Sequence, residues 1–113
     1  MPHEGLGEFE QMVLLAVVRL SQGDDDVYGV PIVEDIQQRT RRSVSRAAVY
    51  VTLRRLERKG LIASWTGDPN SERGGKARHC VKVTAAGMKT LREARRAMNQ
   101  MWSGLDIGLE DRR

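Results

Sequence analysis

The stretch SRAAVYVTLRRLERKGLI, residues 45–62, decides the fold. Ser45 can accept a hydrogen bond from an amide of the first helical turn, which makes it a typical N-cap. Gly60 suits the left-handed position that follows the last turn of a helix. Between them, residues at i, i+4 and i+7 form one apolar face, and these are Val49, Leu53 and Leu56. The stretch therefore predicts a short amphipathic helix with a defined beginning and end.

The opposite side of this predicted helix is basic. Arg46, Tyr50 and Arg54 recur every four residues on a face that the apolar residues leave exposed. The longer run from Arg39 to Lys59 holds eight bases against one acid, Glu57. A charge run is often only a solvated helix face, but here the bases coincide with a capped helix that is apolar on one side. We therefore expect this face to meet a negatively charged partner.

Charge is distributed unevenly along the whole chain. Residues 1–38 hold eight acids and one base and carry a net charge of −7. Residues 39–96 hold sixteen bases and four acids and carry a net charge of +12, which the overall charge of +4 conceals. Such a separation is typical of a molecule that presents one surface to phosphate groups.

The rest of the sequence predicts three more helices and a hairpin. In the apolar run Met12–Val18, β-branched residues make a strand a competing interpretation, but the length of the pattern favours a helix. One aspartate of the turn Asp24–Asp26 can cap the second helix, and Thr84 can cap the last one. The expected elements are helices over 8–22, 28–40 and 85–104 and strands over 61–66 and 78–83.

This order of elements predicts a mainly α fold with a small β-hairpin, which is the plan of a winged helix-turn-helix. We expect this domain over residues 7–84, a C-terminal dimerisation helix over 85–105, and flexible tails at 1–6 and 106–113. In this plan the third helix enters the major groove of DNA and the hairpin wing lies along the backbone. Arginine suits both surfaces, because its planar fork can bind phosphate or the O6/N7 edge of guanine.

The first and last helices predict a dimer interface. The first helix is apolar on nearly all sides and must be covered on nearly all sides. A chain of 113 residues builds a core of limited depth, so a second copy can bury more apolar surface. The last helix carries a seam with spacings of 3, 3, 4, 3 and 4, formed by Met88, Leu91, Ala94, Met98, Met101 and Leu105. The other expected dimer contacts are Phe9, Met12, Leu15, Val18 and Trp102.

Several stretches resemble the PadR family of bacterial transcriptional regulators, over roughly residues 7–105. They are YG at 28–29, VS at 44–45, VYVTLRRLE at 49–57, KGLI at 59–62 and VTAAG at 83–87. Each stretch alone recurs in many winged helices, but the set is fairly specific. The resemblance implies a homodimeric DNA-binding regulator, usually a repressor, in which the first and last helices build the dimer.

Two departures from the family pattern bear on this resemblance. Val51 stands where many members have proline, and it simply continues the helix. Cys80 and Val81 stand where many members have an aromatic pair, which leaves open how the hairpin packs and whether it offers an aromatic effector surface.

The expected partners are double-stranded DNA, a second copy of the chain and a small-molecule effector, with no membrane. The expected DNA contacts are Arg39, Arg41, Arg42, Ser45, Arg46, Ala47, Tyr50, Arg54, Arg73, Lys76 and Arg78. The effector site is unknown; Trp102 and Met98 are candidates, although a simple dimer core explains them better. An alternative is a winged-helix module that binds protein without specific DNA binding. RNA binding is disfavoured, because exposed aromatic residues for base stacking are scarce.

Other function classes find little support in the sequence. His79 and Cys80 are neighbours on a strand and point to opposite faces, so they cannot chelate one metal ion, and no cofactor is expected. No carboxylate pair, nucleophile with a base or phosphate-binding glycine loop points to an enzyme. The single cysteine fits a reducing compartment, and the longest apolar run, Met12–Val18, is too short to span a membrane. Without a signal peptide, a cytoplasmic protein is expected.

Overall fold

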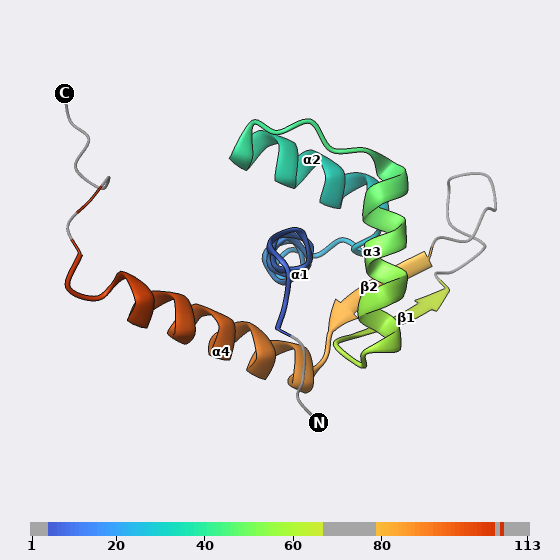
Figure 1. The fold of residues 1–113 in the computed structure, drawn as a ribbon. Coiled ribbons are helices and arrows are strands. Elements are labelled where there is room, and N and C mark those ends of the chain that lie inside the picture. Colours follow the sequence, from blue (N-terminus) through green and yellow to red (C-terminus); the bar gives the residue numbers. More distant parts are fainter. Residues whose placement is uncertain (1–4, 67–78, 106, 108–113) are drawn as a thin grey trace.

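The computed structural model describes residues 5–66, 79–105 and 107 and confirms the predicted order of elements (Figure 1). It is mainly helical with a two-stranded antiparallel hairpin, as the sequence predicts. The elements are α1 (Glu8–Leu20), α2 (Gly29–Thr40), α3 (Arg46–Arg58), β1 (Ile62–Thr66), β2 (His79–Val83) and α4 (Ala85–Trp102). The largest difference from the expected boundaries is two residues, at the ends of α1 and α4.

The caps of α3 and α4 form as predicted. The Ser45 hydroxyl accepts a hydrogen bond from the Ala48 amide at 3.0 Å, and Gly60 adopts a left-handed φ of 77° just after α3. Thr84 caps α4 in the same way, because its hydroxyl accepts from the Gly87 amide at 3.0 Å. Both helices therefore begin where a side chain can satisfy one of the free amides of the first turn.

The prediction that an aspartate caps α2 is wrong. The N-cap of α2 is Tyr28, and its side chain makes no capping hydrogen bond. Val27, which separates the acidic turn from Tyr28, is 5% exposed, and its carbonyl accepts a 2.9 Å hydrogen bond from the Val81 amide. This extended segment, tied to β2, separates the three aspartates from the first turn of the helix.

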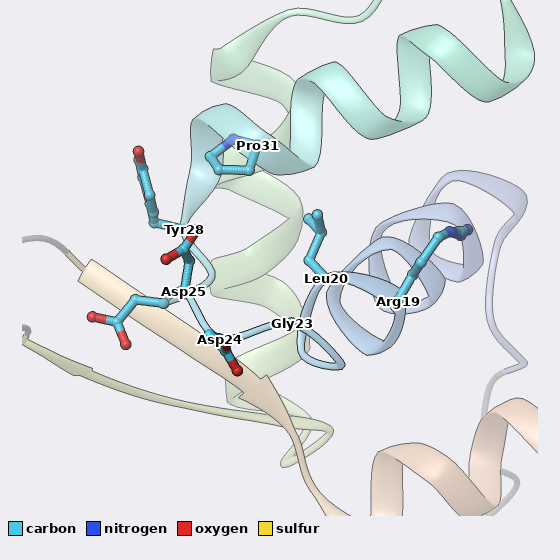
Figure 2. Close-up of a pocket in the computed structure, with 8 residues that line it drawn as sticks. Arg19, Leu20, Gly23, Asp24, Asp25, Tyr28 and Pro31 are labelled. Atoms are coloured by element: carbon cyan, nitrogen blue, oxygen red, sulfur yellow. The ribbon is translucent and has the colours of Figure 1, made fainter.

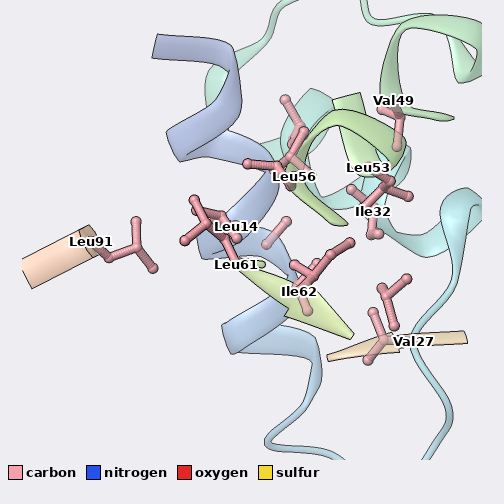
Figure 3. Packing of buried hydrophobic residues seen from close by; sticks show 14 residues of the cluster. Leu14, Val27, Ile32, Val49, Leu53, Leu56, Leu61, Ile62 and Leu91 are labelled. Atoms are coloured by element: carbon pink, nitrogen blue, oxygen red, sulfur yellow. The ribbon is translucent and has the colours of Figure 1, made fainter. Parts of the chain in front are cut away.

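The core forms around α1, which Figure 1 shows nearly end-on between α2, α3, the hairpin and α4. Leu14, Ile32, Leu56 and their neighbours are fully buried, and Leu91 reaches the margin of this cluster from α4 (Figure 3). The expectation that α1 is buried on nearly all sides holds for Val13, Leu14, Ala16 and Val17 but fails for Leu15 between them, which is 46% exposed.

The hairpin is joined to the helices at its base. The strands pair with Ile62 opposite Val83 and Trp65 opposite Cys80. The Ser64 hydroxyl donates a 2.7 Å hydrogen bond to the Glu57 carboxylate, which links β1 to the last turns of α3. With the Val27–Val81 bond, this places the base of the wing at a defined position beside α3.

Candidate nucleic-acid interface

One face of α3 is buried and the other is free. Val49 and Leu56 are 0% exposed, whereas Arg46, Ala47, Tyr50 and Arg54 are all exposed. Within the described part of the chain, neither Arg46 nor Arg54 forms an ion pair. Their guanidinium groups are therefore available to an external anion, as the four-residue spacing predicts.

Val51 lies on the same outer surface and is 52% exposed. In the sequence Val51 is notable only as a substitute for proline, and it is not among the expected DNA contacts. The sequence did contain a signal for this contact: Val51 lies on the basic face of an amphipathic helix, where an apolar side chain cannot be part of the core. A branched aliphatic side chain at this position can contact the methyl group of thymine.

The three arginines around the end of α2 differ in their surroundings. Arg39 pairs with Asp35 at 3.3 Å, and Arg42 pairs with Glu8 at 3.4 Å. Arg41 ends α2 in the left-handed conformation, with φ 62° and ψ 17°. All three side chains are exposed, so they can still reach a phosphate after exchanging an intramolecular partner.

Side chains from α2 shape the turn that leads into α3. The Gln37 side-chain carbonyl accepts a 3.0 Å hydrogen bond from the Val44 amide, and the Thr40 hydroxyl accepts a 3.2 Å bond from the Arg42 amide. These bonds satisfy backbone donors in a segment that has no regular structure. They define the path from α2 to the N-cap of α3 at Ser45.

The predicted wing contacts Arg73, Lys76 and Arg78 lie outside the described residues. Beside the base of the wing, α3 and the hairpin enclose a hollow of about 360 Å³. Its lining combines apolar core residues with polar residues of α3 and β2, namely Tyr50, Leu53, Arg54, Glu57, Ile62, His79 and Val81. Tyr50 and Arg54 thus lie on the side of α3 that faces the wing.

A larger hollow of about 630 Å³ lies at the turn between α1 and α2. Figure 2 shows Asp24 and Asp25 beside Tyr28, with Arg19 of α1 across the hollow. The Arg19 guanidinium already pairs with Asp35 at 3.6 Å. With three aspartates along its edge, this hollow repels phosphate and is no part of the basic surface.

A partly buried ion pair supports the end of α3. Lys59 Nζ lies 3.0 Å from Glu10 Oε2, and the Glu10 side chain is only 10% exposed. Burial alone would raise the pKa of Glu10, but the Gly7 amide and the charges of Lys59 and Arg55 outweigh it and lower the pKa. The sequence alone does not predict this pair, because no spacing rule connects residues 49 positions apart.

The predicted dimer contacts fall into two groups. Leu91 is 8% exposed in the core of a single chain, and Phe9, Met12, Val18, Met88 and Ala94 are half-buried. The second group is exposed and consists of Leu15, Met98, Met101, Trp102 and Leu105. The seam of α4 thus divides: its first half packs on the body of its own chain, and its second half lacks a cover within the described residues.

Two further groups are placed by the structure. His79 is exposed and Cys80 is fully buried and in no disulfide bond within the described residues, which confirms that they point to opposite faces of β2. Among the described residues, no group of three His, Cys, Asp or Glu residues is arranged to hold a metal ion. In the same part of the chain, no helix has the length and apolar character needed to cross a membrane.

The fold and the basic helix with one free face define a winged helix-turn-helix protein. The sequence model of the transcriptional regulator PadR-like family matches residues 14–93 of this chain. The transcriptional regulator Rv3488 of Mycobacterium tuberculosis is 30% identical over 94 residues, which are 83% of each chain. The chain belongs to the PadR-like family of transcriptional regulators, which confirms the resemblance seen in the sequence. Its members regulate transcription through DNA and are not enzymes.

Solved structures share this fold. A transcriptional regulator from Clostridium thermocellum superimposes with a TM-score of 0.65 at 22% identity, over 82% of this chain and 84% of the other. A PadR-like transcriptional regulator from Bacillus cereus gives a TM-score of 0.64 at 19% identity, over 82% of both chains. These similarities support the winged-helix arrangement of the helices and the hairpin.

Proposed function

We propose that the protein is a homodimeric repressor that binds a palindromic operator and responds to a ligand. The observation that carries the proposal is the free face of α3, where Arg46, Tyr50 and Arg54 are exposed while Val49 and Leu56 are fully buried. A helix packed on one side only can enter the major groove without disturbing the core. Ser45 and Ala47 lie at the start of the same helix, close to the base edges in this arrangement.

The strength of binding would come from phosphate contacts by Arg39, Arg41 and Arg42. Arg39 and Arg42 would have to leave Asp35 and Glu8 or share them with a phosphate. The Arg42–Glu8 pair is exposed on both sides, and such pairs contribute only about 0–1 kcal/mol, so a DNA phosphate can replace Glu8 at little cost. Asp35 is only 13% exposed, but it would keep Arg19 as a partner if Arg39 turned to a phosphate. The wing would add contacts from Arg73, Lys76 and Arg78.

The second copy would cover the apolar end of α4. Met98 is 55% exposed, Met101 73% and Trp102 46%, and Leu15 of α1 is the exposed apolar residue of the other predicted dimer helix. Burial of such side chains releases roughly 25 cal/mol for each Å² of apolar surface removed from water. A symmetric dimer would present two copies of α3 to the two half-sites of an inverted repeat.

Regulation would follow from a ligand that binds one conformation of the dimer better than another, where the two conformations differ in the spacing of the two recognition helices. The dimer end of α4, with Met98 and Trp102, is where such a ligand would act on both subunits at once. A dimer bound at a promoter would exclude other proteins from the same DNA, which is repression. The protein would act in the cytoplasm, where its DNA lies.

The decisive experiment is selection of duplexes from a random pool by the purified protein, followed by sequencing. The proposal expects an enriched inverted repeat, two protein chains per duplex, and affinity that falls steeply with salt. The alternative, a winged helix that binds protein, expects no enriched sequence. A selected site without two-fold symmetry would contradict the symmetric dimer and leave sequence-specific DNA binding in place.

A further inference from the structure

The ring of Tyr50 lies against the backbone at the start of α2. A Cβ atom added to Gly29 would stand 2.5 Å from both Cζ and Oη of Tyr50 and 2.7 Å from Cε1. Gly29 is buried, and it is the first residue of α2. Tyr50 therefore bridges the two helices of the helix-turn-helix, in a space that exists because residue 29 has no side chain.

The three atoms nearest to a Cβ at position 29 all belong to the end of the Tyr50 side chain. Gly29 has no positive φ, so alanine can adopt its conformation without strain. Alanine also has a higher helix propensity than glycine. An added methyl group is thus accommodated by moving the Tyr50 ring, and the fold should tolerate it.

The size of that movement matters for the hydroxyl. Separating the atoms from 2.5 Å to an ordinary contact of 3.4 Å displaces the end of the ring by most of an ångström. A hydrogen bond from a hydroxyl to an oxygen spans about 2.5–3.0 Å, so a shift of that size breaks it. If the Tyr50 hydroxyl binds a partner from its present position, that hydrogen bond depends on the absence of a side chain at residue 29.

We propose that Gly29 is a positioning residue for DNA binding: it seats the Tyr50 ring so that the hydroxyl meets the DNA. This inference rests on the proposed function, in which Tyr50 is a DNA contact. It assigns a role to a buried residue of α2 that does not touch DNA itself.

The test is a double-mutant cycle with Gly29→Ala, Tyr50→Ala and the double variant. Gly23→Ala is the matched control, because the nearest atom to a Cβ there is the Leu20 carbonyl oxygen at 3.6 Å. Affinity is measured by fluorescence anisotropy on a duplex that the wild-type protein selects from a random pool. Gly29→Ala and Tyr50→Ala should each weaken binding about threefold to tenfold, the range of one net hydrogen bond. The double variant should bind no more weakly than Tyr50→Ala.

A second measurement needs no DNA. The chain has two tyrosines, Tyr28 and Tyr50, so a spectrum of protein with ¹³C-labelled tyrosine rings contains two sets of signals. The set that disappears in Tyr50→Ala belongs to Tyr50. Gly29→Ala should shift these signals and Gly23→Ala should leave them in place. If Gly29→Ala lowers the melting temperature, the double variant should melt no lower than Tyr50→Ala alone; a double variant that melts below Tyr50→Ala would overturn the seating of Tyr50 on Gly29.

The outcomes separate this inference from the proposed function. Weaker binding by Tyr50→Ala with unchanged binding by Gly29→Ala overturns the positioning role and leaves the DNA contact intact. Additive losses in the double variant also overturn it, because Gly29 would then act independently of the ring. Unchanged binding by Tyr50→Ala, with the ring signals shifted in Gly29→Ala, overturns the DNA contact and with it the positioning role, while the packing geometry remains.

Discussion

The carboxylate of Glu10 and the ammonium group of Lys59 join the first turn of α1 to the C-terminal end of α3. Lys59 Nζ lies 3.0 Å from Oε2 and 3.3 Å from Oε1, and Oε1 also accepts a 3.0 Å hydrogen bond from the Gly7 amide. One side chain therefore caps its own helix and anchors the recognition helix. Its ionisation links the stability of the fold to pH.

The Glu10→Gln variant should change how stability depends on pH. The folded state lowers the pKa of Glu10 below its ordinary value of 4.5, so this contribution is fully present above that pH. It is lost as the pH falls through the lower pKa of the folded state. At pH 7 the variant should be less stable by about 1–2 kcal/mol. Urea unfolding at pH 7 and pH 3 should show this difference shrinking in acid; a constant difference would contradict the role of the charge.

Arg54→Ala should weaken DNA binding without destabilising the protein. The side chain is exposed and has no ion pair within the described part of the chain, so the melting temperature should stay close to that of the wild type. Affinity for a selected duplex should fall by about 1–3 kcal/mol if the contact is to a base. Arg95→Ala, on the exposed surface of α4, removes the same side chain and should bind as the wild type does.

Met98→Asp with Met101→Asp should separate the dimer and leave each chain folded. Both methionines are exposed in a single chain, so only a partner would bury the new carboxylates, and unpaired burial is costly. Sedimentation should show dimer affinity reduced by more than about 100-fold. Gln100→Asp, which lies away from the seam, is the control. Leu91→Asp is unsuitable because Leu91 belongs to the core of one chain.

Gly87→Ala should destabilise the fold, in contrast to Gly29→Ala. A Cβ at Gly87 would collide with the Leu61 carbonyl oxygen and stand 2.6 Å from Val83 Cγ1. The Leu61 carbonyl is held in place by a 3.0 Å hydrogen bond from the Thr84 amide, so backbone and not a mobile side chain must yield. Overpacking of this kind costs about 1–3 kcal/mol. A urea midpoint equal to that of the wild type would mean that α4 can move away from the hairpin freely.

Neutralising the wing should reduce the salt dependence of binding without changing the choice of sequence. Each lost phosphate contact flattens the slope of log affinity against log salt by about 0.9 on B-DNA. Replacing Arg73 and Lys76 by serine should lower the slope by up to about 1.8 and weaken selected and random duplexes by similar factors. An unchanged slope would show that these side chains do not touch DNA, and a loss confined to the selected duplex would show that they read sequence.

Local patterns in the sequence predicted most of the fold. The cap at Ser45, the left-handed Gly60 and the cap at Thr84 are each decided within a few residues of chain, and each formed as expected. The capping of α2 was mispredicted because Val27 is held by β2, a partner more than fifty positions away. Contacts at such separations leave no periodic trace in a single sequence.

The same distinction applies to the candidate site. Periodicity separated the buried face of α3 from its basic face, and the structure places Arg46, Tyr50 and Arg54 on the free side. Periodicity could not reveal the Glu10–Lys59 ion pair or the packing of the Tyr50 ring on Gly29, since both depend on how two helices approach in space. For the seam of α4, spacing identified an apolar stripe, but only the structure shows where the chain's own core ends.

The turn between α2 and α3 contains an arginine in a conformation that glycine adopts more readily. For most residues with a side chain, the left-handed conformation of Arg41 costs roughly 1–2 kcal/mol. A single substitution to glycine would recover part of that energy and remove a positive charge beside the recognition helix. A positive charge at this turn therefore comes with a loss of folding stability that glycine would avoid in part.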